Sequence, residues 1–523
     1  MAALPSPGQP PPHSRSGLYR LALLLTVTVA VLLRLLNLQS LQAEIYGDIV
    51  IVREYIDFIR HGLWPTHFAL SAGPLYHYLI MPVIAVAGPG YLGLKIASVV
   101  VSLGVLAATF AVGRRLAGDL LGLLSLFVAS VSSWLLIFSR LGNSQILVPF
   151  LGTVSLWLLV RFVQEQGRRD LVLSATVAAL GLYSYPPSFI LAPVMASTLA
   201  ALRLTGLRVR WKDVGIYGLT TLVVGLPFAW IVGKDPANFL TGYIGGKIRP
   251  AGSVLRPLLE NLGKAAISLH FRGDFVFRSN PMGRPHLDAV SGVLLLLGVV
   301  FWLLPERQRW SPVIFVPFLL QHVPSVLVLS ASGEVPSASR TLGAAPEAYL
   351  LVASGVMLLI RLAAPLRGAP SALAAVLLAA ILGINIHRYF FEYIPGLPYG
   401  NTPIAALVSS YVNDLPPETD VYLVHCCWKD GMPEPKGIEY GLDRPGRFHQ
   451  LERGKVSCDT LERLREPAVL IWDFAAPLPD PALAPCAGWL SVQYYQSPQG
   501  RPVFNASPLR RGGASRTGRI PAR

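Results

Sequence analysis

Two carboxylates stand directly after the first apolar run of the chain, in the segment Glu44-Ile-Tyr-Gly-Asp48. At a membrane surface, such a pair can accept a proton from an incoming hydroxyl group or coordinate a divalent cation such as Mg²⁺ or Mn²⁺. A structural interpretation is also open, because Asp48 can cap a helix that begins at Ile49. The spacing by itself favours the cap, and the same carboxylate can serve both purposes.

Three arginines are candidate ligands for a phosphate group. Arg34 lies near the outer end of the first apolar run, where a charged side chain is costly and usually faces a partner or a cavity. Arg140 and Arg340 stand in the polar clusters Ser139-Arg-Leu-Gly-Asn143 and Ser339-Arg-Thr341. A guanidinium fork can donate two parallel hydrogen bonds to a phosphate. The alternative is that Arg34 snorkels toward the headgroups and that the other two anchor the chain at the interface.

Further polar and aromatic side chains near these groups are candidate substrate contacts. His77 could assist a phosphate or an acceptor, although a packed interfacial histidine is the simpler interpretation. The full set of candidate substrate contacts is Tyr76, His77, Asn143 and Tyr183.

The elements that position these residues are membrane spans. Of the 523 residues, 53% are hydrophobic and only 14% are charged, and several apolar runs reach the ~20 residues needed to cross a bilayer. We expect helices, because a span must satisfy its own backbone in lipid. The first run is longer than a signal-peptide core and is interpreted as a retained helix. The expected spans, about eleven, are 18–41, 91–113, 119–138, 144–163, 171–187, 188–204, 214–233, 289–305, 312–331, 345–361 and 371–386.

The distribution of Lys and Arg predicts the orientation of these spans. Alternate connections are rich in arginine, which makes them cytoplasmic, with the N-terminus inside and the C-terminus outside. The loops 42–90, 234–288 and 332–344 then face the outside of the cell membrane. The net charge of +15 does not indicate a nucleic-acid partner, because the basic residues do not form one face with interleaved aromatic residues.

The first two of these outer loops have a predicted structure of their own. Residues 49–63 carry apolar side chains at helical spacing, which predicts an amphipathic helix along the membrane interface. Leu75 to Ala87 is apolar but short for a span, and is typical of a second interfacial or re-entrant helix. The basic loop 234–288 suits a lid over an anionic lipid headgroup, although a solvated basic surface is the alternative.

The composition changes after His387, and residues 387–509 predict a small extracytoplasmic α/β domain. Residues 420–425 and 467–472 have the pattern of buried strands, and a helix is expected from Asp459. All four cysteines lie in this segment, where one or two disulfides or free thiols are equally open. We expect the tails 1–17 and 510–523 to be disordered.

Together these residues resemble the C-type membrane glycosyltransferases, and most closely the dolichyl-phosphate-mannose–protein mannosyltransferase and aminoarabinose transferase relatives. Members carry an arginine late in the first span, an acidic motif in the first outer loop and an interfacial helix. An element similar to Pro74-Leu-Tyr-His-Tyr78 follows, and then a second span similar to the run from Leu92 to Gly118. The resemblance is strongest over residues 20–205.

The resemblance implies that Asp48 is the catalytic carboxylate and that Glu44 is its acidic partner, with metal binding by the pair as an open question. Arg340 corresponds to the arginine that meets the donor phosphate, with help from Arg34 or Arg140. The chain departs from the family in the spacing of Glu44 and Asp48, and in having Asn143 where an acidic residue is common. The implied donor is a polyprenyl-phosphate-linked sugar, and the acceptor is a hydroxyl group of a protein, lipid or glycan.

Two other functions compete with this inverting glycosyl transfer. A transporter or flippase of lipid-linked sugars would place polar groups near the bilayer midplane, whereas the polar groups here gather at one face. A membrane anchor with a binding domain outside would leave the long loop 42–90 unexplained. A multi-pass glycosyltransferase of the cell membrane is therefore the leading hypothesis.

Overall fold

The computed structural model describes residues 17–67, 73–237, 243–250, 252–365, 369–497, 500–510 and 518–520. Contacts within the chain divide it into two units, one made of Met1–Leu38 with Tyr55–Tyr393, the other of Gln39–Glu54 with Ile394–Arg523. The boundary falls inside helix α2 (Gly47–Arg60), which contributes to both units. The tails that the sequence predicts to be disordered lie almost wholly outside the described residues.

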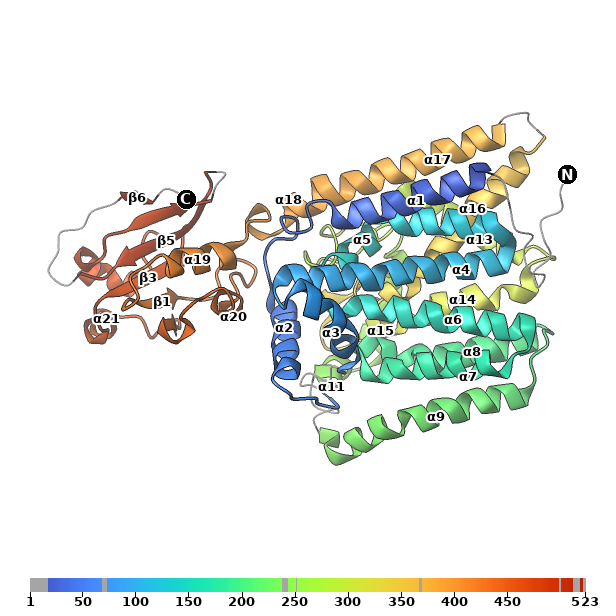
Figure 1. Ribbon diagram of the computed structural model, residues 1–523, viewed down its shortest axis with the longest axis horizontal. Helices are drawn as coiled ribbons and strands as arrows, with labels where there is room; N and C mark the ends of the chain where they lie inside the picture. The colour runs from blue at the N-terminus through green and yellow to red at the C-terminus, as the bar shows by residue number, and fades with distance from the viewer. Residues whose placement is uncertain are drawn as a thin grey trace. The chain divides into compact units, whose positions relative to one another are not determined.

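The first unit is a bundle of helices, and Figure 1 shows its long helices running side by side. Its apolar helices bury only part of their surface, which is expected where lipid covers the rest. Its further helices are α1 (Gly17–Leu35), α3 (Leu75–Ala87), α4 (Tyr91–Val131), α5 (Ser133–Ser139), α6 (Leu147–Glu165), α7 (Arg168–Ala179), α8 (Leu191–Leu204), α9 (Trp211–Lys234), α11 (Tyr243–Ile248), α12 (Leu255–Ile267), α13 (Ala289–Leu303), α14 (Pro312–Leu320), α15 (Val323–Val326), α16 (Ala345–Ala363) and α17 (Ala369–Ile386).

The chain is a multi-pass membrane protein. Within the described residues, seven helices are long and apolar enough to cross a bilayer, and a bent pair, Ala289–Leu303 with Gln308–Val326, makes an eighth if it counts as one span. The sequence predicts about eleven spans. The difference comes from α7, α13 and α14, which are short or broken, and from α4, which joins two of the predicted spans.

Helix α4 reverses direction in its middle. Ala117 and Gly118 leave the helical region, with φ/ψ of −147°/28° and 84°/−176°. A methyl group added at Gly122 would lie 3.0 Å from the carbonyl oxygen of Phe110, so residues twelve positions apart are neighbours. Because a continuous helix rises 1.5 Å per residue, this contact requires two antiparallel halves. The sequence prediction of separate spans on either side of 114–118 agrees with this geometry.

The two short helices expected in the first outer loop are both present. Helix α2 covers Gly47–Arg60, and its apolar residues Ile49, Val52, Ile56 and Ile59 are buried. Helix α3 has the bounds expected from the sequence, Leu75–Ala87. The first helix was predicted from apolar spacing, and the structure confirms it but ends it at Arg60, with Leu63 of the predicted stripe exposed. The second was predicted from its apolar composition and short length, and its bounds are confirmed.

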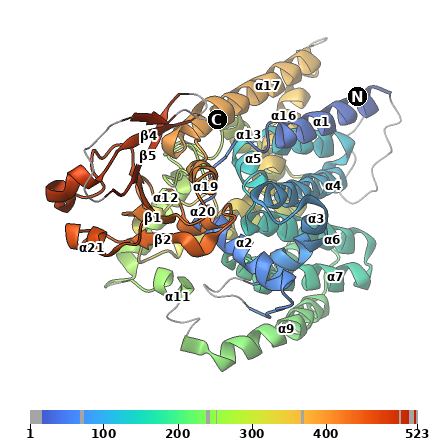
Figure 2. The same ribbon diagram turned by 60° about the vertical axis from the view of Figure 1, so that its left-hand side comes forward.

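The second unit contains one six-stranded sheet with the strand order β2-β1-β3-β5-β4-β6. Strands β2, β1 and β3 are parallel, and β5 is antiparallel to both β3 and β4. Figure 2 shows the strands side by side. Their bounds are β1 (Asp420–Val424), β2 (Phe448–Leu451), β3 (Ala468–Asp473), β4 (Gln493–Gln496), β5 (Pro502–Pro508) and β6 (Gly518–Ile520).

Helices and two disulfides complete this α/β unit. The predicted strands at 420–425 and 467–472 and the helix from Asp459 correspond to β1, β3 and α21 (Cys458–Arg463). Val421, Leu423 and Ile471 pack into a core with α19 (Ile404–Asn413). The cysteines form the pairs Cys426–Cys427 and Cys458–Cys486. The sequence left disulfides and free thiols equally open, and the structure contains disulfides.

The reversal of α4 provides a test of the bundle. The backbone of Gly118 occupies a region that essentially only glycine adopts, so Gly118→Ala should destabilise the protein by about 1–3 kcal/mol. The matched control is Gly215→Ala in α9, where an added methyl group meets no atom within 4 Å. Thermal unfolding of the purified protein in detergent should show a lower Tm for Gly118→Ala alone. Equal Tm values for the two variants would contradict the reversal.

Candidate functional site: an apolar pocket with a cationic end

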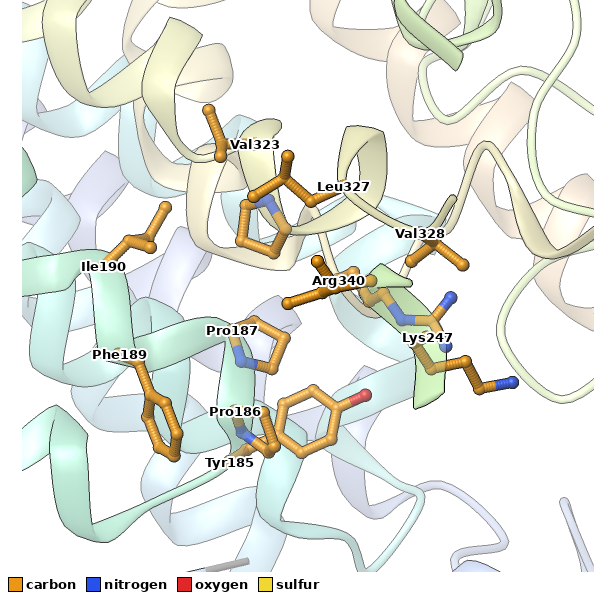
Figure 3. A pocket seen from close by; sticks show the side chains of 12 residues that line it. Tyr185, Pro186, Pro187, Phe189, Ile190, Lys247, Val323, Leu327, Val328 and Arg340 are labelled. Atoms are coloured by element: carbon orange, nitrogen blue, oxygen red, sulfur yellow. The ribbon is translucent and has the colours of Figure 1, made fainter. Parts of the chain in front are cut away.

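A largely apolar pocket of about 170 Å³ lies in the first unit. Its walls come from η4 (Pro186–Ile190), from α11 and from α15 with the residues after it. Proline, branched aliphatic and aromatic side chains make up most of the lining, which gives a surface suited to a hydrocarbon chain. The lining residues are Tyr185, Pro186, Pro187, Phe189, Ile190, Lys247, Ile248, Val323, Pro324, Leu327, Val328 and Arg340 (Figure 3).

The charged groups of the pocket gather around one carboxylate. Glu334 forms ion pairs with Lys247 and with Arg340, whose Nη2 lies 2.6 Å from Glu334 Oε2. Partial burial raises the pKa of Glu334, but the hydrogen bonds and charges of Lys247 and Arg340 outweigh it and hold that pKa below its usual value. Two cations share one carboxylate, so the group keeps one net positive charge. In Figure 3 the Tyr185 hydroxyl lies on the same side as these cations.

A network of hydrogen bonds holds the loop that carries Arg340. The buried Asp274 carboxylate accepts the amide N–H of Ala338 at 2.8 Å and that of Val276 at 2.7 Å. Trp134 Nε1 donates to the Ala338 carbonyl oxygen at 3.0 Å. Burial raises the pKa of Asp274 to about 6, while these amide bonds and the charge of Arg340 lower it. The loop is therefore fixed from two sides just before Arg340.

Arg34 and Arg140, the other predicted phosphate ligands, are fully buried and contact the protein's own carbonyl groups. Arg34 donates to the Ala30 and Ser130 carbonyl oxygens at 3.1 Å and to Ser102 Oγ at 3.0 Å. Arg140 donates to the carbonyl oxygens of Leu33 and Leu36 and stacks on the Tyr389 ring. Neither arginine lines the apolar pocket. Their described contacts are those of residues that position helix α1.

Tyr183 has a structural contact, whereas Tyr185 of the same motif lines the pocket. The Tyr183 hydroxyl donates to the Val224 carbonyl oxygen at 2.7 Å and accepts the Phe228 N–H at 3.1 Å. In a regular helix these two backbone groups would bond to each other. The hydroxyl is thus inserted between the hydrogen-bonding backbone groups of α9, beside Pro227. Both an inserted side chain and a proline are known causes of helix bending.

The remaining predicted substrate contacts are buried in the first unit. The Tyr76 hydroxyl and Ser98 Oγ lie 2.9 Å apart, and the His77 ring packs edge-on against Tyr55 at 5.4 Å. Burial lowers the pKa of His77 to about 3, so the ring is neutral at physiological pH. Asn143 is buried and its Oδ1 accepts from the Ser144 hydroxyl. These contacts agree with the packed histidine considered from the sequence.

The two acidic residues of the first outer loop belong to the second unit. Both Glu44 carboxylate oxygens lie 3.2 Å from the Ala405 amide nitrogen, at the start of α19. Burial raises the pKa of Glu44 to about 8, although the amide bonds lower it. Asp48 is exposed in the first turn of α2 and has no hydrogen bond or ion pair within the described residues. The sequence predicted Asp48 as the N-cap, but the helix begins one residue earlier, at Gly47, so Asp48 lies inside its first turn. There its negative charge still stabilises the helix N-terminus.

The donor set does not fit a metal centre in the part of the chain that the structure describes. No group of three or more His, Cys, Asp or Glu side chains is placed to hold an ion there. Glu44 already uses its oxygens to accept backbone amide protons. A divalent cation on Glu44 and Asp48 stays a prediction, and it would have to be held by this pair without a third carboxylate, His or Cys among the described residues.

The arrangement of helices and sheet is the C-type fold of membrane glycosyltransferases. ArnT from Cupriavidus metallidurans, solved with undecaprenyl phosphate, is similar with a TM-score of 0.58 and 14% identity, over 92% of this chain and 97% of that one. The archaeal oligosaccharyltransferase AglB from Archaeoglobus fulgidus, solved with an inhibitory peptide and a dolichol-phosphate, has a TM-score of 0.51 and 13% identity. This match covers 93% of this chain and 74% of AglB.

Residues 71–232 match the dolichyl-phosphate-mannose-protein mannosyltransferase family. The family match and the shared fold confirm the resemblance that the sequence motifs indicate. A search of curated protein sequences finds no significant match.

The sequence pointed to Arg340 but not to Lys247, Glu334 or Asp274, which surround it. These residues are far from Arg340 in the chain or carry no recognisable motif, so only the folded structure brings them together. The signal available in the sequence was the basic character of 234–288, the loop that supplies Lys247.

The position of Tyr183 leads to a test of its role. Tyr183→Phe should cost about 1 kcal/mol, because the Val224 carbonyl loses the hydroxyl donor. Hydrogen–deuterium exchange should report faster exchange at the Phe228 amide, with a small drop in Tm. Tyr494→Phe is the matched control, since Tyr494 is exposed and has no side-chain hydrogen bond among the described residues. A Tyr183→Phe variant with unaltered exchange in α9 would show that the inserted hydroxyl is not structural.

Proposed function

We propose that the protein transfers a sugar from a polyprenyl-phosphate donor to an acceptor hydroxyl group at the outer face of the membrane. The observation that supports this most directly is the apolar pocket that ends at Lys247 and Arg340. A polyprenyl phosphate has the same division, an apolar chain joined to an anionic head. The solved relatives ArnT and AglB bind undecaprenyl phosphate and dolichol-phosphate, as their structures state.

In this proposal the isoprenoid chain packs on the apolar wall and the phosphate meets the cations. Pro187, Ile190 and Leu327 contribute to the apolar wall. Arg340 donates to Glu334, and a guanidinium has five N–H donors in a fork that suits a phosphate as well as a carboxylate. The net positive charge of the Lys247–Glu334–Arg340 group attracts the anion and stabilises the charge that develops on the leaving phosphate.

Asp48 is the proposed general base. The acceptor oxygen attacks the anomeric carbon, the bond from that carbon to the phosphate oxygen breaks, and polyprenyl phosphate leaves with the bonding electrons. Asp48 takes the proton of the acceptor hydroxyl, and attack from the face opposite the phosphate inverts the anomeric centre. Asp48 is exposed and has no partner in the part of the chain that the structure describes, which suits a group that must meet a substrate. No step is assigned to a metal ion.

Glu44 is proposed to position Asp48 rather than to react. Its carboxyl group joins the segment before Asp48 to the start of α19 through the Ala405 amide. Gly437 lies against Ile45 of the same segment, since a methyl group added there would lie 2.7 Å from the Ile45 side chain. The acidic segment is thereby packed against the α/β unit.

The donor pocket is tested by Arg340→Gln and Lys247→Gln. Each substitution should weaken the binding of a polyprenyl phosphate by about tenfold, because a charge-assisted hydrogen bond to the phosphate is lost. Native mass spectrometry of the purified protein with polyprenyl phosphate, and with the uncharged polyprenol as a comparison ligand, measures the effect. Arg256→Gln, on the exposed face of α12 and paired with Glu260, is the control. Equal affinities for the lipid phosphate in all variants would exclude this pocket as the donor site.

The catalytic role is tested by Asp48→Asn. The loss of a general base should slow transfer by about 10²–10⁴-fold and leave polyprenyl-phosphate binding unchanged. A cell-free assay with purified protein and polyprenyl-phosphate sugars measures glycosidic product. Asp57→Asn in the same helix is the control, because Asp57 faces Arg60 at the surface. Full activity of Asp48→Asn would overturn the assignment, and sugar-lipid flipping in liposomes without product would point to a transporter.

A further inference from the structure

A second cavity lies on the other side of the loop that carries Glu334. Its volume is about 260 Å³, and it is formed by the end of α12, the segment after α12 and the loop 332–336. Like the apolar pocket it is lined by two cationic side chains, here Lys264 and Arg272, together with the exposed ring of Phe275. The lining residues are Lys264, Ile267, Arg272, Phe275, Ser332, Gly333, Val335 and Pro336.

The cations of this cavity have no carboxylate partner among the described residues. Lys264 Nζ donates to the Ser332 carbonyl oxygen at 2.8 Å. The Arg272 guanidinium carbon lies 4.8 Å from the centre of the Phe275 ring. Two other basic residues of the loop 234–288 do have carboxylate partners, since Arg256 pairs with Glu260 and Arg284 with Glu392, each at 2.9 Å. Two positive charges therefore face one hollow without compensation.

The walls of the cavity are held by buried contacts. Asn261 Nδ2 donates to the carbonyl oxygens of Val326 and Val328 at 3.0 and 2.8 Å, which fixes α12 against the chain after α15. Val335 and Pro336 are buried behind the exposed Ser332 and Gly333. The cationic side chains thus extend from a supported framework.

We propose that this cavity binds the phosphate group of a second ligand, with Lys264 and Arg272 as its cationic contacts. An oxyanion would gain charge-assisted hydrogen bonds from both side chains, and the adjoining part of the ligand would pack on Phe275 and Ile267. The proposal goes beyond the donor pocket, whose cations are Lys247 and Arg340. Two sources offer this chemistry, a sugar phosphate of a substrate and the headgroup of an anionic bilayer lipid.

The two cavities share the loop 332–336. Glu334 contacts Lys247 and Arg340 of the donor pocket, whereas its neighbours Ser332, Gly333 and Val335 line the second cavity. A ligand in the second cavity would therefore contact the loop 332–336, whose Glu334 holds Lys247 and Arg340 in the donor pocket. Occupation of one cavity should change the affinity of the other, and by linkage the effect must be reciprocal.

The test uses the full-length protein in phosphatidylcholine nanodiscs and hexose 1-phosphate as the probe, with free hexose for comparison. Wild-type protein should bind the hexose phosphate and not the free sugar. Arg272→Gln and Lys264→Gln should each weaken binding by about tenfold, whereas Arg256→Gln should not. Measurement of Tm for each variant separates loss of a ligand contact from loss of folded protein.

Two further arms identify the ligand and separate this site from the donor pocket. If phosphatidylglycerol in the nanodisc displaces the hexose phosphate, the natural ligand of the cavity is a lipid headgroup. If phosphatidylglycerol does not displace it, the natural ligand is a soluble phosphate or a substrate phosphate. Both results support the site. Binding should survive Arg340→Gln. Binding that vanishes in Arg340→Gln, or that is equal in wild type and Arg272→Gln, would overturn the proposal. A lack of glycosyl transfer would refute only the proposed function, since this test does not use transfer.

Discussion

The C-terminal end of α1 is the point at which several distant parts of the first unit are joined. The last carbonyl groups of a helix have no partner within it and carry partial negative charge. Here Arg140 donates to the carbonyl oxygens of Leu33 and Leu36, and Lys95 Nζ donates to that of Leu38 at 3.0 Å. Three parts of the chain that are distant in sequence are therefore joined where α1 ends.

This interaction explains why charged side chains are buried in a span. Arg34 adds bonds to the Ser130 carbonyl oxygen and to Ser102, both on α4. In an apolar environment a cation is tolerated where carbonyl groups replace water. Leu38 is the last residue of this part of the chain that is bound in this way, and the acidic segment 39–54 follows it directly. Arg34 and Arg140, which the sequence suggested as phosphate ligands, thus hold the end of α1 in place, and segment 39–54 starts from that fixed end.

Local pattern predicted the elements well, and the site only in part. Short apolar runs predicted α3 at its observed bounds, and β1 and β3 within a residue or two, because each depends on the burial of a local segment. The membership of Gln39–Glu54 in the α/β unit was not predictable, since it depends on contacts such as Glu44 with Ala405. Arg340 was predicted from a motif, but its partners Lys247 and Glu334 are joined to it only by folding.

The distribution of charge distinguishes the roles of the basic residues better than their positions in the sequence. Arg34 and Arg140 donate to carbonyl oxygens inside the first unit, and Lys247 and Arg340 share one carboxylate. Within the described residues, Lys264 contacts a carbonyl oxygen and Arg272 contacts an aromatic ring. Lys264 and Arg272 should bind an added anion more readily than Arg34 and Arg140, which are fully buried, and than Lys247 and Arg340, which already share a carboxylate. The basic residues of the loop 234–288 therefore differ in their contacts, and the two proposals assign anion binding to Lys247, Lys264 and Arg272 among them.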